Sequence, residues 1–303
     1  MIHSASSRPE KLHKKDFFED ASLPLQVLIR DPQPEFPLHG HDFHELVIIL
    51  GGTAIHAIDR QCYPVRSGDA FVISPRQAHQ YLELCDLSLV NILFDKEGLS
   101  MASWDIRALP GFHALFFLEP AYRSQHNFES RLQLSSQQLQ TVLPVVRQLE
   151  AEIRDHHGGY RVMAKGAFMQ LCVHFSRWYS ENVHASESMD LLRIGKAIAF
   201  LETNYAEKIS LPQLAATSHL SERQFCRIFK QCLGRSPIEH LLEVRIQHAS
   251  SLLRESPMSV TEIAFACGFS DGNYFTRCFK KHLKQSPTQY RQKARALSIP
   301  SGD

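Results

Sequence analysis

The feature that most constrains this chain is a helix-turn-helix pattern that occurs twice near its C-terminus. The two copies read LAATSHLSERQFCRIFKQCLGRSP (residues 214–237) and IAFACGFSDGNYFTRCFKKHLKQSP (residues 263–287). They lie 49 residues apart at their start and 50 residues apart at their end, which indicates one residue inserted early in the second helix of the second copy. Two such units on one chain suit the reading of two successive stretches of a DNA groove.

The overall composition is that of a globular protein. A length of 303 residues allows two domains with cores of their own. No stretch approaches a membrane span, and the N-terminus lacks the apolar core of a signal peptide, so we expect a cytoplasmic protein with no membrane partner. The seven cysteines form no CxxC pair and are odd in number, which favours reduced thiols.

The net charge of +1 conceals an asymmetry between the two parts of the chain. Residues 1–189 carry 17 Lys/Arg against 22 Asp/Glu, a net charge of −5. Residues 190–303 carry 16 against 10, a net charge of +6. Only the C-terminal part therefore has the basic balance that binding to phosphate requires.

Residues 25–95 have the pattern of a β-rich domain. Short β-branched runs (VLIR, ELVIIL, TAIHAI, DAFVIS and LSLVNILF) alternate with turn signals. We interpret four segments as turns: DPQPEFP at residues 31–37, Gly51-Gly52, Asp59-Arg60, and residues 66–69. Many short strands at close spacing favour a sandwich or a small barrel.

Helical periodicity replaces the β pattern further along the chain. One apolar stripe runs from Leu139 to Ile153 and another from Ala164 to Trp178, which predicts an αα-hairpin. A surplus apolar face on this hairpin could pair with a second subunit, or both faces could pack on the barrel. Residues 181–190 have the composition of a linker, and about seven helices are expected after it.

Local signals mark the ends of several C-terminal helices. Ser221 with Gln224, and Ser259 with Glu262, have capping-box spacing at predicted helix starts. Gly234 lies where a helix C-cap is expected.

The second helix of each repeat is amphipathic and offers side chains that read bases. The first buries Phe225, Ile228, Phe229 and Cys232; the second buries Phe275, Cys278 and Phe279. On the opposite faces, arginine can donate two hydrogen bonds to guanine, asparagine can read adenine, and aspartate can accept from cytosine N4. Because the pattern is duplicated within a basic region, DNA binding is favoured over a merely solvated face. The candidate DNA-binding residues are Arg223, Cys226, Arg227, Lys230, Asp271, Asn273, Arg277 and Lys281.

The double motif, with ACGFSDGNYFTRCFKKH and the closing SPTQYR, resembles the AraC/XylS family of bacterial transcription regulators. The resemblance implies an N-terminal cupin-type barrel that binds an effector, dimerising helices, and a C-terminal domain whose two units are joined by a long helix at about residues 238–254. Within the family the chain is most similar to activators of L-rhamnose operons, in the barrel stretch FPLHGHDFHELVIILGG, the Gly-Asp turn and both DNA-reading helices.

The resemblance also implies partners. These are double-stranded DNA, a small-molecule sugar effector such as L-rhamnose, a second copy of the chain, and the sigma factor of RNA polymerase. In similar activators an acidic residue at the position of Glu262 lies near the sigma factor. The simpler interpretation of Glu262 is a helix-cap glutamate.

A group of histidines with one glutamate raises the question of a metal in the barrel. His39, His41, Glu45 and Gly52 fit the first cupin motif, while Gly68, Pro75 and His79 fit the second loosely. Two histidines separated by one residue on a strand point to the same face. Together with Glu45 and His79 they could bind iron, nickel or zinc.

The second cupin motif lacks its usual glycine and its terminal asparagine. Regulators that resemble this chain often keep such residues without a metal. We therefore expect no resident metal and no other cofactor, and instead interpret the barrel as a polar effector pocket. The candidate effector-binding residues are His39, His41, Glu45, His79 and Tyr81, with Arg30 as a further candidate. By resemblance Tyr81 supplies a pocket aromatic; otherwise it is a tyrosine of the barrel rim.

The alternative is a metal-binding cupin sensor or enzyme fused to a DNA-binding domain, with His39, His41, Glu45 and His79 as ligands. No nucleophile elbow, P-loop or dinucleotide fingerprint is present, and we do not expect an enzyme.

The sequence thus predicts an α+β multidomain protein. The expected parts are a cupin-like barrel with an N-terminal arm (residues 1–134), a helical dimerisation hairpin (135–180), a linker (181–190) and a double helix-turn-helix domain (191–296). The expected function is regulation of transcription, as an activator of sugar catabolism genes.

Overall fold

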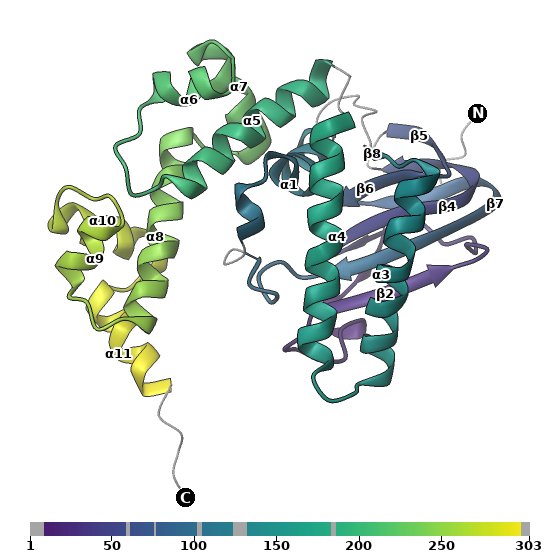
Figure 1. Ribbon diagram of the computed structural model, residues 1–303, viewed down its shortest axis with the longest axis horizontal. Coiled ribbons are helices and arrows are strands. Elements are labelled where there is room, and N and C mark those ends of the chain that lie inside the picture. Colours follow the sequence, from purple (N-terminus) through teal and green to yellow (C-terminus); the bar gives the residue numbers. More distant parts are fainter. Residues whose placement is uncertain are drawn as a thin grey trace, which may run out of the picture. The chain divides into compact units, whose positions relative to one another are not determined.

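The computed structural model describes residues 9–58, 61–75, 77–101, 105–123, 132–182 and 186–297. The chain divides into two compact units, residues 1–195 and residues 196–303. Within the described ranges no helix combines the length and the apolar character that crossing a membrane requires. The predicted class, a β-rich N-terminal part followed by a helical C-terminal part, is confirmed (Figure 1).

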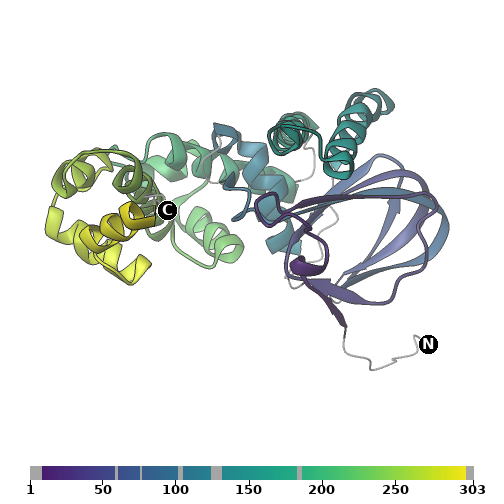
Figure 2. The same cartoon turned by 90° about the horizontal axis from the view of Figure 1, so that it is seen from below.

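The N-terminal unit is built on one eight-stranded sheet that curls round on itself (Figure 2). The main path runs β1-β3-β7-β4-β6-β8, with β2 paired to β7 and β5 paired to β4. All pairs are antiparallel except β1 with β3. The strands are β1 (Glu10–Leu12), β2 (Leu25–Arg30), β3 (His39–His41), β4 (His44–Ile58), β5 (Gln61–Arg66), β6 (Asp69–Ile73), β7 (His79–Phe94) and β8 (Leu132–Gln133).

Two of these strands are much longer than the sequence pattern predicted. The expected turn at Gly51-Gly52 is wrong, because β4 runs through these glycines and only shifts its register against β7 there. Such an irregularity bends a strand without ending it. Gly52 has a positive φ of 69°, and a Cβ at this position would lie 2.2 Å from the carbonyl oxygen of Asp86. The glycine is therefore required by a close backbone approach. Residues 59 and 60, another predicted turn, lie outside the described ranges.

The first half of β4, residues 44–49, is buried on both faces, which explains its continuous apolar run. Leu46 and Ile48 belong to the core that the sheet shares with the helices. Val47 and Ile49 belong to a second core on the concave side of the sheet. Since successive side chains on a strand point to opposite faces, Glu45 is directed to the concave side together with Val47.

Helices α3 (Ser136–Asp155) and α4 (Tyr160–Asn182) form the predicted αα-hairpin. They lie side by side and cover one face of the sheet (Figure 1). The outer side of α4 carries Val162 and Met163, which are 75% and 47% exposed. Before the hairpin the chain forms 3₁₀ turns at Lys14–Asp16 and Asp105–Ala108, the short helices α1 (Pro110–His113) and α2 (Glu119–Arg123), and a π-helical segment at Ala114–Leu118.

The predicted linker is largely helical where it is described. Glu181 and Asn182 end α4, residues 186–190 begin α5, and residues 183–185 lie outside the described ranges. The seven helices expected after it are α5 (Ser186–Thr203), α6 (Leu211–Thr217), α7 (Glu222–Leu233), α8 (Pro237–Glu255), α9 (Val260–Ala266), α10 (Gly272–Leu283) and α11 (Pro287–Leu297). Helix α8 is the long joining helix.

The two sequence repeats are also repeats of local structure. Gly234 ends α7 in the left-handed conformation, as predicted, and Lys284 takes the same conformation after α10. The predicted position of the inserted residue is wrong. Helices α7 and α10 both have 12 residues, and the extra residue is Ser270, in the turn just before Asp271 caps α10. A turn accepts one more residue at low cost, whereas a helix would have to rotate its buried face.

One arginine of α8 joins the loop before α6 to the second repeat of the C-terminal unit. Arg245 on α8 donates from Nε to the Tyr205 carbonyl oxygen and from Nη2 to that of Glu207, both at 2.7 Å. Its guanidinium also lies 5.7 Å from the ring centre of Phe269, in the turn of the second repeat. Gly268 in the same turn approaches the loop so closely that a Cβ would lie 2.6 Å from the Ala206 carbonyl oxygen. The loop before α6 is thereby held against the turn before α10.

We predict that Gly268→Ala destabilises the C-terminal unit by about 1–3 kcal/mol, because alanine at a positive φ is strained and its Cβ would meet backbone. Gly272→Ala is the matched control, since a Cβ there meets nothing within 4 Å. The measurement is urea unfolding of the full chain followed by circular dichroism. Both tryptophans, Trp104 and Trp178, lie in residues 1–195, so their fluorescence reports the other unit. Equal stability of the two variants would contradict the close approach at Gly268.

Candidate DNA-binding surface and ligand cavity

Helix α7 presents a basic face to solvent, as predicted. The Ser221 hydroxyl accepts a hydrogen bond from the Gln224 backbone N–H and so begins the helix. Phe225 and Phe229 are fully buried, which fixes the rotation of the helix about its axis. Arg223, Arg227 and Lys230 are consequently exposed, while Cys226 is half-buried beside them. Because Arg223 and Arg227 stand one turn apart, both guanidinium groups project from the same side of α7.

Helix α10 presents an equivalent face with different chemistry. Asn273, Arg277 and Lys281 are exposed, and so is Lys280. Tyr274 was not predicted from the sequence; its side chain is 42% exposed, and its ring centre lies 6.0 Å from the Arg277 guanidinium. Tyr274 occupies the position in its repeat that Gln224 occupies in α7, and this match could have identified it. The second face therefore combines an amide, an aromatic ring and basic groups.

Asp271 is the N-cap of α10, and this differs from its predicted role as a base-reading acceptor. Its Oδ1 accepts from the Asn273 backbone N–H at 3.2 Å, and its Oδ2 accepts from that of Tyr274 at 2.8 Å. Both carboxylate oxygens are thus engaged in starting the helix. An N-cap side chain of this kind satisfies backbone donors that have no partner inside the helix.

The C-terminal halves of the two exposed faces converge near the start of α8. Glu239 forms a capping box with Ser236, and these hydrogen bonds lower the pKa of the Glu239 carboxyl. The positive charges of Lys281 and Lys230 lower the same pKa further. One lysine from each helix therefore lies within electrostatic reach of a single carboxylate.

Glu262 forms a complete capping box with Ser259 at the start of α9. Its carboxylate accepts from the Ser259 backbone N–H at 2.7 Å, and its own N–H donates to the Ser259 hydroxyl at 3.2 Å. These hydrogen bonds lower the pKa of the Glu262 carboxyl. The helix-cap interpretation of Glu262 is confirmed.

A cavity of about 130 Å³ opens on the concave side of the N-terminal sheet. All five predicted effector residues line it, as does Arg30. Leu12 and Phe17 of the N-terminal segment also contribute, because β1 pairs with β3 at this edge of the sheet. The remaining lining residues are Leu28, Gln33, Phe36, Phe43, Gln80, Asn91 and Leu93.

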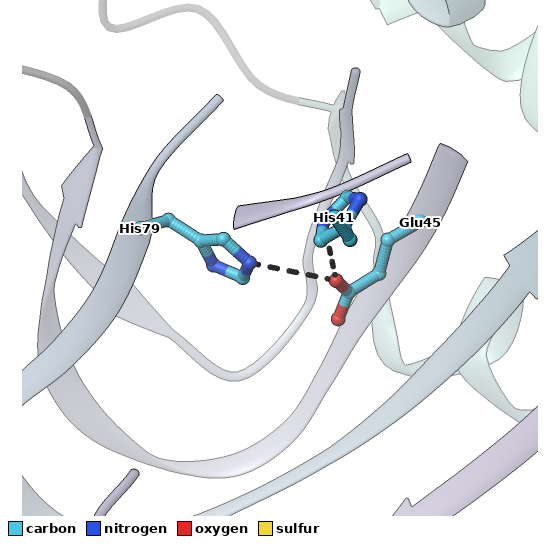
Figure 3. Close-up of side chains that lie close together, drawn as sticks. All are labelled: His41, Glu45 and His79. Carbon is cyan, nitrogen blue, oxygen red and sulfur yellow. Dashed lines mark ion pairs between the residues drawn. The ribbon is translucent and has the colours of Figure 1, made fainter. Parts of the chain in front are cut away.

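Three of the predicted residues point toward one another at one wall of this cavity (Figure 3). The Glu45 Oε2 atom lies 3.2 Å from His41 Nε2 and 3.6 Å from His79 Nε2. His39 pairs directly with His79 across β3 and β7, so the side chains of His39, His41 and His79 share one face of the sheet. His39 nonetheless stays outside the cluster, and its Nδ1 lies 2.9 Å from the Pro37 carbonyl oxygen.

Burial disfavours the charged form of two cavity histidines, His79 and His39. It lowers the pKa of His79 well below the usual value, and the neighbouring histidines lower it further. The pKa of His39 is also lowered, chiefly by burial. Neutral imidazole offers one donor and one acceptor, which suits hydroxyl groups as well as metal ions. His44, one residue before Glu45, faces the helices instead, where burial lowers its pKa to about 3.

The aromatic and amide groups of the cavity complete its chemistry. The Tyr81 ring stacks on His56 with ring centres 5.0 Å apart, so one of its faces is covered. Asn91, which the sequence analysis missed, has a buried side-chain oxygen without a hydrogen-bond partner among the described residues. A single amide within the apolar run LSLVNILF was the signal that could have identified it.

Comparison with known proteins agrees with this division into a ligand-binding and a DNA-binding part. Residues 27–172 match the family model of the AraC-like ligand binding domain. Residues 214–293 match the model of a helix-turn-helix domain. An HTH-type transcriptional activator RhaS of Enterobacter sp. (strain 638) is 33% identical over 281 residues, covering 93% of this chain and 96% of the relative. The chain belongs to the AraC/XylS family of transcription regulators.

A second curated relative gives the same assignment. RhaS of Klebsiella pneumoniae (strain 342) is 34% identical over 284 residues, covering 93% of this chain and 96% of that protein. Among solved structures, the DNA-binding domain of AdpA in complex with a target DNA is 32% identical, with a TM-score of 0.34 over 36% of this chain and 98% of that domain. The chain is therefore a DNA-binding transcription regulator of this family with a ligand-binding domain, close to the RhaS activators.

Capping and base reading by Asp271 are separable by substitution. We predict that Asp271→Ser, which gives α10 the cap that Ser221 gives α7, preserves both stability and DNA affinity within a few tenths of a kcal/mol. Asp271→Ala should cost about 1 kcal/mol of stability. The measurements are urea unfolding and fluorescence anisotropy with operator DNA. If the serine variant is stable but loses affinity for specific DNA only, Asp271 reads a base after all.

Proposed function

We propose that this protein activates genes of sugar catabolism by binding operator DNA through α7 and α10, under the control of a small sugar such as L-rhamnose bound in the N-terminal cavity. The observation that carries the DNA part is the pair of structurally equivalent amphipathic helices in a basic unit. The relation to RhaS supports the sugar part.

In this proposal the two helices have different reading chemistry. Arg223 and Arg227 of α7 donate to guanine, and Asn273 of α10 reads adenine. Lys230, Lys280 and Lys281 are exposed at or beyond the middle of their helices and position the protein on phosphates together with Arg277. Asp271 acts by capping α10, which fixes the direction of the Asn273 side chain.

A symmetric operator would require two copies of the chain. We propose a homodimer in which α4 contributes to the contact, because Val162 and Met163 leave apolar surface exposed there. Each subunit would occupy two major-groove segments about 34 Å apart. Activation further requires a contact with RNA polymerase, for which the exposed side of α9 around Glu262 is our candidate.

The cavity has the mixture of groups that recognises a deoxysugar. Histidine, arginine and amide groups supply donors and acceptors for hydroxyls, and Phe17, Phe36 and Phe43 supply apolar surface for ring carbons and a methyl group. The effector must bind one arrangement of the two units better than another, because a ligand without such a difference shifts no equilibrium.

The DNA part is tested with Arg223. We predict that Arg223→Ala weakens binding to specific DNA by about 1–3 kcal/mol and relaxes the preference at one base pair. Glu222→Ala is a suitable control, since Glu222 is the exposed neighbour of Arg223. Affinities would be measured by anisotropy with operator and random duplexes at fixed salt. An equal loss on both duplexes would show that Arg223 contacts only phosphate.

The effector part is tested by thermal shift of the full chain against a panel of pentoses, hexoses and deoxyhexoses. We predict that one sugar of the panel raises the Tm of the wild type, and L-rhamnose is the first candidate. Once the binding site is saturated, the Tm should keep rising with the logarithm of the sugar concentration. Tyr81→Ala should abolish this shift, whereas Leu82→Ala should not, because Leu82 is the exposed next residue on the same strand. A panel without any shift would remove the sugar from the proposal and leave DNA binding untouched.

A further inference from the structure

We propose that His41, Glu45 and His79 form a binding site for one divalent first-row transition metal ion. One potential ligand atom from each residue lies within 4.8 Å of the other two. Glu45 Oε2 lies 3.2 Å from His41 Nε2 and 3.6 Å from His79 Nε2. Around a tetrahedral ion with bonds of about 2.0–2.1 Å, two ligand atoms are about 3.3 Å apart, so the observed distances are close to those of a metal site.

The hydrogen bond of His41 prepares its other nitrogen to bind a metal. His41 Nδ1 lies 2.7 Å from the Phe43 carbonyl oxygen, which can only accept, so Nδ1 carries a proton. A metal-binding histidine usually makes this kind of bond with its second nitrogen, which fixes the tautomer and the ring orientation. The Nε2 lone pair is then directed toward the cluster.

Hydrogen bonding within the cluster does not explain its geometry. An imidazolium at His41 would donate from Nε2 to Glu45, yet this contact, although 3.2 Å long, does not have hydrogen-bond geometry. Both ring nitrogens of His79 likewise lack a hydrogen-bond partner among the described residues. A site that binds a cation would have this arrangement, in which three buried groups converge without hydrogen bonds to one another.

The cluster is also closed to solvent. The side chains of His41, Glu45 and His79 are 0%, 4% and 2% exposed. Within the described ranges no lysine or arginine forms an ion pair with Glu45. A buried carboxyl group needs polar partners, and a divalent ion bound beside it would be one.

The donor set indicates the class of ion. Two imidazoles and one carboxylate suit zinc or iron(II) rather than calcium or magnesium, which prefer all-oxygen sites. Three protein ligands leave at least one coordination position open, and the cavity lies on that side. The proposal is independent of the sugar effector.

The structure further distinguishes three ligands from the four that the sequence motif contains. His39 lies next to His79, with ring centres 4.2 Å apart, but it is not part of the converging group. We therefore expect His39→Gln to retain the metal, whereas His79→Gln and Glu45→Gln should lose it. His174→Gln, on the outer helix α4, is a control for adventitious binding by histidine.

The test uses the full chain without an affinity tag, equilibrated with Zn²⁺ and then dialysed, with elemental analysis and thermal shift as readouts. We expect about one Zn²⁺ per chain for the wild type and the two control variants, and a higher Tm with metal than without. For His79→Gln and Glu45→Gln we expect the affinity for zinc to fall by more than the about 10–100-fold that is lost when a group hydrogen-bonded to a metal ligand is removed. Wild-type protein without bound zinc, or equal binding by His79→Gln, would overturn the proposal.

X-ray absorption of zinc-loaded wild-type protein tests the same proposal without any variant, in case the substitutions impair folding. Scattering from two imidazole rings and one further oxygen ligand is expected, and a spectrum without imidazole scattering would overturn the assignment. Loss of zinc from His39→Gln would overturn the three-residue ligand set. Neither sugar nor DNA is present in these measurements, so their failure would leave the proposed regulator intact.

Discussion

The burial of the first half of β4 on both faces is the constraint on which the N-terminal unit depends. Because its side chains alternate, one set joins the core beneath α3 and α4, and the other builds the concave wall. The same alternation sends His44 toward the helices and Glu45 into the cavity, although they are neighbours in sequence. Gly52 allows the strand to pass Asp86 closely and to continue, so a single strand supplies both the core and the polar site.

In the C-terminal unit the same residues that begin helices also orient the exposed side chains. Ser221 and Asp271 cap α7 and α10, and the buried phenylalanines fix the rotation of each helix. The exposed groups are therefore held by backbone hydrogen bonds and core packing rather than by contacts with one another. Arg245 and Gly268 add the contact between the loop before α6 and the second repeat, which a duplicated motif alone would not provide.

The chemistry of the cavity is compatible with both an effector and a metal ion, and the three residues of the metal cluster also line the effector cavity. The cluster of His41, Glu45 and His79 forms one wall, whereas Arg30, Tyr81 and Asn91 lie elsewhere around the same space. Neutral imidazoles serve either purpose, because each offers a lone pair. A metal at that wall would present an open position to any hydroxyl group in the cavity, so the two proposals can hold together or separately.

The sequence alone determined the two helix-turn-helix repeats, the caps at Ser221, Ser259 and Gly234, the buried faces and the basic charge around them, because these depend on residues within one or two helical turns. It did not identify Asp271 as the cap of α10. It also indicated the strands and the polar residues of the cavity. The tertiary structure decided the features that depend on long-range strand pairing. Gly51-Gly52 bends a strand and does not end it. Asn91, Leu12 and Phe17 reach the cavity, and His39 stays outside the cluster. The physical reason is that register between β3, β4 and β7 is set by contacts across tens of residues, which no local pattern encodes.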